Sequence, residues 1–275
     1  MKTKIHASLR VAAFAATLFL GASAASAQLL QSWQFNETAG TALNATLNSG
    51  PGSSVFASAI AGATTNGSGS LVISGNYAAS VRSFAAIPSI SSGIVQLDVN
   101  VSGWSFVGVN AASVPLLEFG LSAASTGNNA AIRTAHIYYD VDSTVGASLA
   151  GVAGGSGSSS TPIAQDQVFA PPGGLTRITP ITFRLIANFD TLSYTVSHSD
   201  SAFAVLSSGN IATGKAANFV SVRALDDFSI GGTGGNFAID SITLTAIPEP
   251  SSFASIAGLG VLGLVLSRRR RTRTT

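Results

Sequence analysis

The sequence predicts an all-β body, and three observations lead to this fold class. Short runs in which apolar and polar residues alternate recur along the chain, separated by turns rich in Gly, Pro, Asn and Ser. This is the pattern of half-buried antiparallel strands. Charged residues make up only 9% of the chain, a composition typical of secreted all-β proteins and not of helical enzymes. Cysteine is absent, which excludes thiol nucleophiles, redox disulfides and cysteine-based zinc sites.

Strand character is clearest in residues 94–101, where every second residue is a Val or a Leu. Residues 181–196 predict a hairpin with its turn at Asp190 and Thr191. The last strand of the body is expected at 237–246. Further strands are expected at 29–36, 55–60, 70–74, 80–85, 104–109, 116–121, 132–141, 203–206 and 220–225.

Residues 142–174 are the weak part of the pattern. Residues 151–162 are a low-complexity Gly/Ser segment, and a Pro-Pro-Gly-Gly run follows at 171–174. Neither segment has a period, whereas the sequence on both sides keeps its strand character. We therefore expect a flexible excursion at the rim of a single domain and not a domain boundary.

Two segments carry a resemblance to a known fold family. The order W-x-F-N-E-x-A-G-T-x-L from Trp33 to Leu43, followed by N-S-G at 48–50, resembles the first strand and loop of concanavalin A-like (laminin G-like) domains. The order F-x-I-D-x-I-x-L from Phe237 to Leu244 resembles the closing strand of that fold. The resemblance implies one two-sheet antiparallel jelly-roll sandwich over residues 28–246, with its first and last strands paired.

The amino-terminal end has the three parts of a secretory signal peptide. Lys2, Lys4 and Arg10 form a basic region, residues 11–20 are apolar, and Ala25-Ser26-Ala27 is an A-x-A cleavage site. Residues 1–27 are therefore predicted to be removed after export by the Sec machinery, which leaves Gln28 as the first residue.

The carboxyl-terminal end, residues 247–275, also has three parts. Pro248-Glu249-Pro250 comes first, an apolar run at 253–266 follows, and a basic cluster closes the chain. The basic cluster contains Arg268, Arg269, Arg270 and Arg271. An apolar helix of this length reaches about 20 Å, short of the roughly 30 Å hydrocarbon core of a bilayer, so it suits a transient anchor. The arginines hold their end of the segment in the cytoplasm.

This order resembles the PEP-CTERM sorting signal of exported bacterial proteins. The resemblance implies an exosortase-type membrane transpeptidase as a partner, and a final location at the cell surface or in the extracellular matrix. The association of such signals with polysaccharide export implies a link to exopolysaccharide.

The basic character of the chain comes from its two ends. Residues 28–247 contain six basic and eleven acidic side chains, a net charge of −5, although the whole chain has a net charge of +2. Basic residues used for targeting do not indicate nucleic-acid binding, so no nucleic-acid partner is expected.

No catalytic site is predicted. Jelly-roll glycan hydrolases need paired carboxylates on one strand, and neither Glu37 nor Glu118 has an acidic residue two positions on. Asp140 and Asp142 form such a pair and are weak candidates for calcium, but no D-x-D-x-D-G loop supports a metal, and solvent-facing turn residues are the favoured interpretation. His136 is expected to stand alone, in a surface or partly buried structural role.

Aromatic side chains are the remaining candidates for binding. Trp33 and Trp104 are expected in the core, whereas Tyr138, Tyr139 and Tyr194 could stack on sugar rings. The sequence thus predicts a non-enzymatic exported surface protein. The alternatives are a carbohydrate-binding module and a glycan hydrolase.

Overall fold

The structure is a computed structural model of the chain, and it describes residues 27–46, 54–60, 62–74, 81–105, 114–126, 132–142, 146–153, 163–169, 176–224 and 236–248. The chain divides into a body, Gln28–Ala246, and a second unit made of Met1–Ala27 and Ile247–Thr275. The fold reported below is that of the body.

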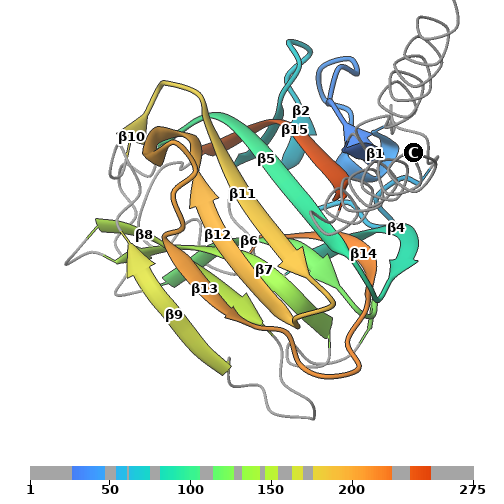
Figure 1. Ribbon diagram of the computed structural model, residues 1–275. Coiled ribbons are helices and arrows are strands. Elements are labelled where there is room, and N and C mark those ends of the chain that lie inside the picture. The colour runs from blue at the N-terminus through green and yellow to red at the C-terminus, as the bar shows by residue number, and fades with distance from the viewer. Residues whose placement is uncertain are drawn as a thin grey trace, which may run out of the picture. The chain divides into compact units, whose positions relative to one another are not determined.

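The described part of the body is built almost entirely from antiparallel strands (Figure 1). The strands are β1 (Gln28–Trp33), β2 (Ala63–Thr65), β3 (Leu71–Ser74), β4 (Val81–Ile90), β5 (Ile94–Ser105), β6 (Val114–Ser122), β7 (Arg133–Asp142), β8 (Gly146–Ala153), β9 (Ile163–Phe169), β10 (Thr176–Arg177), β11 (Ile181–Asn188), β12 (Ser193–His198), β13 (Ser207–Asn210), β14 (Ala217–Ala224) and β15 (Asn236–Ile247). Two short 3-10 helices, Leu43–Ala45 and Ser199–Ser201, accompany them.

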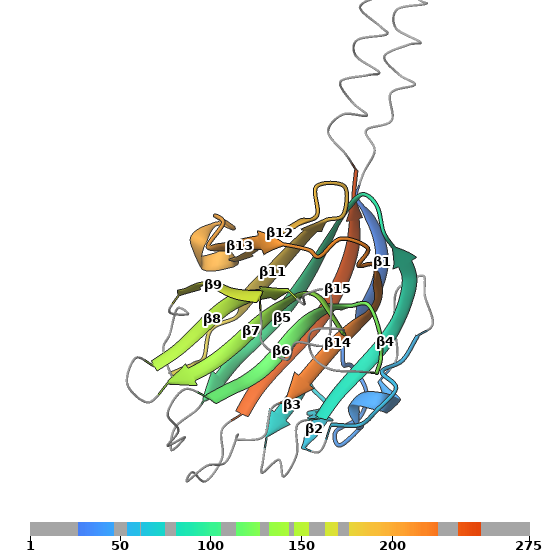
Figure 2. The same ribbon diagram turned by 90° about the horizontal axis from the view of Figure 1, so that it is seen from below.

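These strands form two sheets packed face to face (Figure 2). Within the described residues, the nine-stranded sheet has the order β13-β12-β11-β5-β15-β3-β2, with β1 on β15 and β10 on β5. The six-stranded sheet has the order β4-β14-β6-β7-β8-β9. The body is therefore an all-β antiparallel sandwich, as the sequence predicts.

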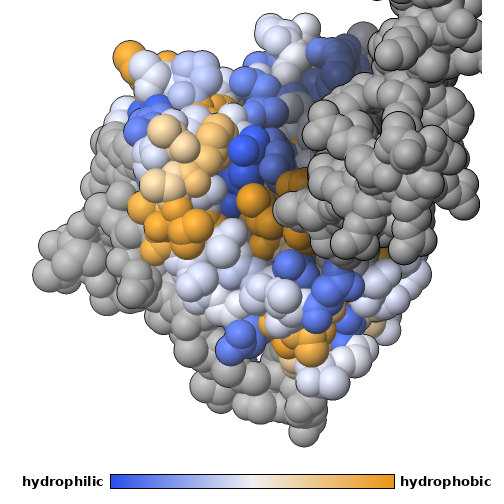
Figure 3. Space-filling view, in the orientation of Figure 1, coloured by the Kyte–Doolittle hydropathy of each residue, from blue (hydrophilic) through white to orange (hydrophobic). Residues whose placement is uncertain are grey.

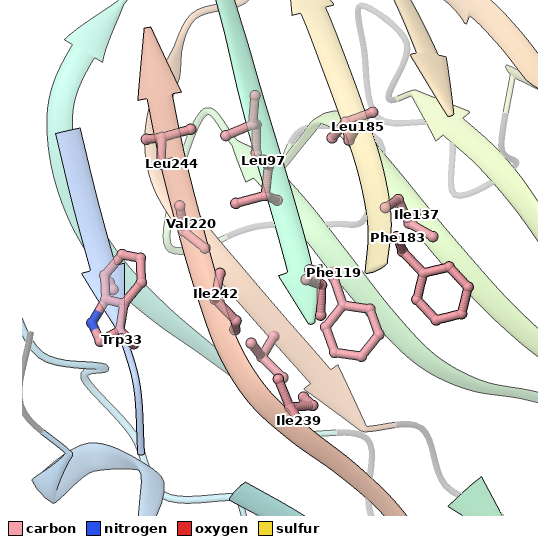
Figure 4. Close-up of a cluster of buried hydrophobic side chains, with 14 of the residues drawn as sticks. Trp33, Leu97, Phe119, Ile137, Phe183, Leu185, Val220, Ile239, Ile242 and Leu244 are labelled. Carbon is pink, nitrogen blue, oxygen red and sulfur yellow. The ribbon is translucent and has the colours of Figure 1, made fainter. Parts of the chain in front are cut away.

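The core lies between the two sheets, where both contribute every second residue of their strands (Figure 4). Leu97 and Phe183 come from the nine-stranded sheet, and Phe119 and Ile137 come from the six-stranded sheet. Phe237 joins the layers, because its ring lies 5.8 Å from the rings of both Trp104 and Phe119. Each fully buried side chain of this size contributes about 1.5–3 kcal/mol to the free energy of unfolding.

Strand β15 closes the fold. Its first part pairs with β3, from Asn236↔Ser74 to Ile239↔Leu71, and its second part pairs with β1. The pairing with β1 begins at Gln28↔Ala246 and Leu29↔Thr245, passes an irregularity, and ends at Trp33↔Ile242. The expected neighbourhood of the first and last strands is thus confirmed.

Most of the other expected strands are confirmed, and the hairpin turn at Asp190 and Thr191 joins β11 to β12. Two expectations are wrong. Residues 203–206 form no strand, because β13 begins only at Ser207. The excursion expected at 142–174 contains β8 and β9, which extend the six-stranded sheet. Most residues of β8 (GASLAGVA) are Gly, Ala or Ser, and their pattern gives little sign of a strand.

One smaller expectation has a different outcome. The segment 55–60 contributes only an isolated bridge, Phe56↔Ala85. No helix among the described residues is long and apolar enough to cross a membrane. The predicted signal peptide before Ala27 and the predicted apolar helix at 253–266 lie outside the described residues.

Candidate functional site

A group of polar side chains lies on the face of the six-stranded sheet that points away from the core. Neighbouring residues of a strand point to opposite faces. Because Phe119, Ile137 and Val222 point into the core, the residues next to them point outward. We call this group the Glu118 cluster; it consists of Arg82, Glu118, Ser122, Arg133, His136, Ser221 and Arg223.

The carboxylate of Glu118 is fully buried and is shared by three arginines from three other strands. Arg133 from β7 binds it with both Nε (2.6 Å to Oε1) and Nη2 (3.0 Å to Oε2). Arg82 from β4 approaches Oε2 to 2.8 Å, and Arg223 from β14 approaches it to 3.3 Å. A buried carboxylate needs several such donors to offset its lost hydration. Glu118 thus ties together β4, β14, β6 and β7.

A chain of hydrogen bonds continues from Glu118 to two hydroxyl groups. The Nδ1 of His136 is hydrogen-bonded to Oε1 of Glu118. Its Nε2 lies 3.1 Å from Oγ of Ser122, which in turn lies 2.9 Å from Oγ of Ser221. Glu118, His136 and Ser122 are all completely buried. The order carboxylate–imidazole–hydroxyl is that of a serine hydrolase triad.

The protonation states decide what this chain of groups can do. Burial lowers the pKa of His136 to about 4, with Glu118 opposing and Arg82 and Arg133 reinforcing the shift. Burial alone would raise the pKa of Glu118, but His136, Arg133 and Arg82 outweigh it and hold that pKa well below its ordinary value. At neutral pH the imidazole is neutral, and the hydroxyl of Ser122 donates its hydrogen to Oγ of Ser221 and not to Nε2 of His136.

This arrangement supports a structural brace and not a nucleophile. An imidazole with a pKa of about 4 is a weak base toward a serine hydroxyl at neutral pH. Ser122 is 0% exposed, so a substrate has no access to its oxygen in this structure. Three arginines also compete with His136 for the carboxylate that would stabilise an imidazolium ion.

Gly120 shows how closely the brace is packed. Gly120 lies on β6 between Glu118 and Ser122 and pairs with His136. A Cβ atom at this position would lie 2.6 Å from the Cα of His136 and 2.5 Å from the carbonyl oxygen of Ala135. A glycine is therefore required where the imidazole crosses β6.

The structure corrects the sequence analysis at His136. The expectation of an isolated, surface or partly buried histidine is wrong, because His136 is 0% exposed and is bonded to Glu118. A pair of acidic residues two positions apart on one strand could not indicate this cluster, because Glu118 has no acidic partner on its own strand. The partners of Glu118 lie 36, 15 and 105 residues away, at Arg82, Arg133 and Arg223. The one available signal was that four of the six basic residues of the body fall on predicted strands, and three of these four are the partners of Glu118.

The candidate aromatic residues have mixed outcomes. Trp33 and Trp104 fill the core, as expected. Tyr194 is only 1% exposed, so the interpretation as a sugar-stacking surface is wrong for this residue. Tyr138 and Tyr139 lie on β7, but the description does not extend to their side chains.

The other candidate residues remain predictions. Asp140 and Asp142 pair with Ser148 and Gly146 across β7 and β8, and their side chains lie outside the description. Among the described residues, no group of three or more His, Cys, Asp or Glu side chains could hold a metal ion. Ala27 and Pro248 are described, whereas Ala25, Glu249, Pro250 and Arg268, Arg269, Arg270 and Arg271 lie outside the described residues.

A second polar network lies on the outer face of the nine-stranded sheet. Arg184 binds Asp98 through two hydrogen bonds of 2.8 Å, and its guanidinium carbon lies 3.8 Å from the ring centre of Phe203. On the face drawn in Figure 3, hydrophobic residues lie in separate patches among hydrophilic ones. The most exposed large apolar side chains of the described residues are Ile178 and Val205, at 89% and 61%.

Comparison with known proteins gives one sequence match and many structural ones. Residues 246–271 match the model of the PEP-CTERM protein-sorting motif. No curated protein sequence matches the chain.

The structural matches share the fold at low sequence identity. The carbohydrate recognition domain of Emp47p has a TM-score of 0.51 at 13% identity, over 82% of this chain and 99% of that domain. The winged bean acidic lectin complexed with methyl-α-D-galactose has a TM-score of 0.45 at 9% identity, over 66% of this chain and 88% of the lectin. The Bacillus licheniformis β-glucanase has a TM-score of 0.44 at 9% identity, over 82% of this chain and 100% of the enzyme.

These findings define the fold: an all-β antiparallel sandwich of the kind seen in the Emp47p domain. More particularly, the chain carries a PEP-CTERM sorting motif at the end of that sandwich. The motif implies an exported protein that is sorted at the cell envelope.

The brace predicts a specific dependence of stability on pH. The unfolded chain binds a proton at position 136 below pH 6.5, whereas the folded chain resists protonation until about pH 4. Stability therefore rises with pH across this window and is lost on acidification. We expect a loss of about 2 kcal/mol from His136 between pH 7.5 and pH 5, measured by urea unfolding.

His136→Gln supplies an amide donor for Glu118 but does not titrate, so this variant should lose most of that pH dependence. His198→Gln is the matched control, because burial also lowers the pKa of His198 but this side chain lies outside the Glu118 cluster and accepts a hydrogen bond from the amide of Ser201. An unchanged pH dependence in His136→Gln would show that His136 is not the titrating group.

Proposed function

We propose that this protein is a non-enzymatic component of the cell surface or extracellular matrix, which an exosortase-type transpeptidase sorts and cleaves. The observation that carries the proposal is the sorting-motif match at 246–271, which begins at the last residues of β15. The body thus ends where the motif starts. The signal peptide predicted at 1–27 would supply export through the Sec machinery.

The chemistry of the tail supports processing at the membrane. Pro248 and Pro250 lack backbone N–H donors and disfavour helix in the residue before them, so the sequence predicts an extended triplet that does not join a sheet. The apolar run and the arginines that follow would hold the segment at the membrane until cleavage. Attachment to the exopolysaccharide of the envelope is the destination that this class of signal supports.

The sorting proposal predicts the effect of removing the motif. Pro248→Ala combined with Glu249→Ala should leave the full-length protein in the membrane fraction, because the processing enzyme no longer binds its recognition segment. Ser251→Ala combined with Ser252→Ala is the matched control and should be processed normally. Size and fractionation on immunoblots give the readout; unchanged size and location of the first variant would refute the sorting proposal.

Carbohydrate binding by the body is the second candidate function. It is supported by the fold likeness to Emp47p, whose matched domain is a carbohydrate recognition domain. In that case the processed protein should bind defined members of a glycan array at micromolar concentration. Heat-denatured protein is the control, and binding no stronger than that of the control would remove this candidate. Hydrolysis of glycans is the weaker alternative, because the Glu118 cluster is sealed and braced by arginines.

A further inference from the structure

The turn between β2 and β3 contains the one Asn-Gly pair of the chain, Asn66-Gly67. The two strands pair from Ala63↔Ile73 to Thr65↔Leu71, and the turn occupies residues 66–70 at the end of this hairpin. Both residues of the pair are exposed to solvent. The side-chain carbonyl carbon of an asparagine is an electrophile, and a following glycine has no side chain to hinder attack by its own amide nitrogen. The pair therefore has the parts of an intramolecular reaction.

The turn holds the side-chain oxygen of Asn66 with two backbone amides. The N–H of Ser68 donates to Oδ1 over 2.8 Å, and the N–H of Ser70 donates to it over 3.1 Å. Such donors polarise the carbonyl group and stabilise the negative charge that develops on its oxygen when a nucleophile attacks the carbon. The electrophile of the pair is thus activated by the fold of the turn.

The two nitrogen atoms that take part in the reaction are available. Within the part of the chain that the structure describes, neither Nδ2 of Asn66 nor the backbone N–H of Gly67 makes a hydrogen bond. The turn uses only the oxygen of the Asn66 amide. Loss of Nδ2 therefore costs the described turn no hydrogen bond, and the nucleophile is open to water.

We propose that Asn66 is a site of spontaneous modification, at which its side-chain amide is lost and aspartate or isoaspartate is formed. The amide nitrogen of Gly67 gives its proton to water and bonds to Cγ of Asn66. The bond between Cγ and Nδ2 then breaks, and Nδ2 takes up a proton and leaves as ammonia. A five-membered imide ring remains.

Water opens the imide at either of its two carbonyl carbons, and the Gly67 nitrogen regains its proton. Addition of water at Cγ gives aspartate with the original main chain. Addition at the main-chain carbonyl carbon of residue 66 gives isoaspartate, in which the chain runs through the side chain. Either route consumes one water molecule and releases one ammonia molecule.

The two products have different effects on the hairpin. Aspartate still offers an oxygen to the amides of Ser68 and Ser70, so the turn is kept. Isoaspartate adds one carbon to the main chain beside Gly67, where space is short: a Cβ atom on Gly67 would lie 3.1 Å from the amide nitrogen of Ala39. We expect this product to break the 2.9 Å bond from the Asn66 amide to the Ser70 carbonyl. Formation of isoaspartate thus loosens the β2–β3 edge of the nine-stranded sheet.

The test follows the full chain in detergent at mildly alkaline pH, where the Gly67 amide loses its proton more readily. Peptide mass spectrometry measures the loss of each side-chain amide, and labelling by isoaspartyl methyltransferase measures isoaspartate. Asn66 should convert at least about tenfold faster than the other exposed asparagines, a difference of about 1.4 kcal/mol in activation free energy. These internal controls, none of which precedes a glycine, are Asn36, Asn44, Asn210 and Asn236. Conversion of Asn66 no faster than that of the controls overturns the proposal.

Asn66→Ser locates the reaction, because serine offers a hydroxyl oxygen to the same amides but has no amide to lose. This variant should not be labelled by the methyltransferase, whereas the matched control Asn210→Ser should be labelled like the wild type. Labelling that persists in Asn66→Ser overturns the assignment to Asn66.

The wild-type chain unfolded in urea supplies a reference that depends on no variant. The turn restricts the approach of the Gly67 nitrogen to Cγ but polarises the carbonyl group, so the folded and unfolded chains should convert at rates within about tenfold of each other. A folded chain that stays unmodified while the unfolded chain converts shows that the fold protects Asn66, and it overturns the proposal.

Discussion

The closure of β15 is the constraint on which the rest of the structure depends. This strand lies inside the nine-stranded sheet, where β5, β3 and β1 all bind it, and its side chains Phe237, Ile239, Ile242 and Leu244 are buried in the core. Because it is also the last strand of the body, the sheet is complete only when the carboxyl-terminal end is in place. The same strand then continues into the sorting motif. β15 therefore both completes the sheet and leads into the sorting motif.

The six-stranded sheet is held in a different way. Its inward face is apolar, but its outward face carries a buried carboxylate with three arginines, an imidazole and two hydroxyls. Such a group fixes the register of four strands, because each partner of Glu118 satisfies it only from one position along its strand. A buried ion cluster adds specificity more than stability, since desolvation offsets much of its Coulomb energy. The resemblance of Glu118, His136 and Ser122 to a catalytic triad is one of order and not of chemistry.

The sequence predicts what depends on local pattern. Strict alternation in 94–101 and 181–196 places β5, β11 and β12 correctly, because one face of each strand is buried. The sequence does not predict β8, because most residues of this strand are small and do not alternate between apolar and polar. It also fails for the Glu118 cluster, because strand order brings together side chains from separate parts of the chain, and strand order is a property of the whole fold. The sorting tail is local, so it could be recognised from its residues alone.

The molecule thus combines a folded body, in which the Glu118 cluster is buried, with a sorting motif in its tail. The central claim is that the body closes only when β15 is paired with β1 as far as Ala246. Amide hydrogen exchange of the full-length protein, followed by mass spectrometry of peptides, tests this most directly. This claim predicts slow exchange throughout 242–246, at the level of β5. Fast exchange of 242–246 in the folded protein would contradict it.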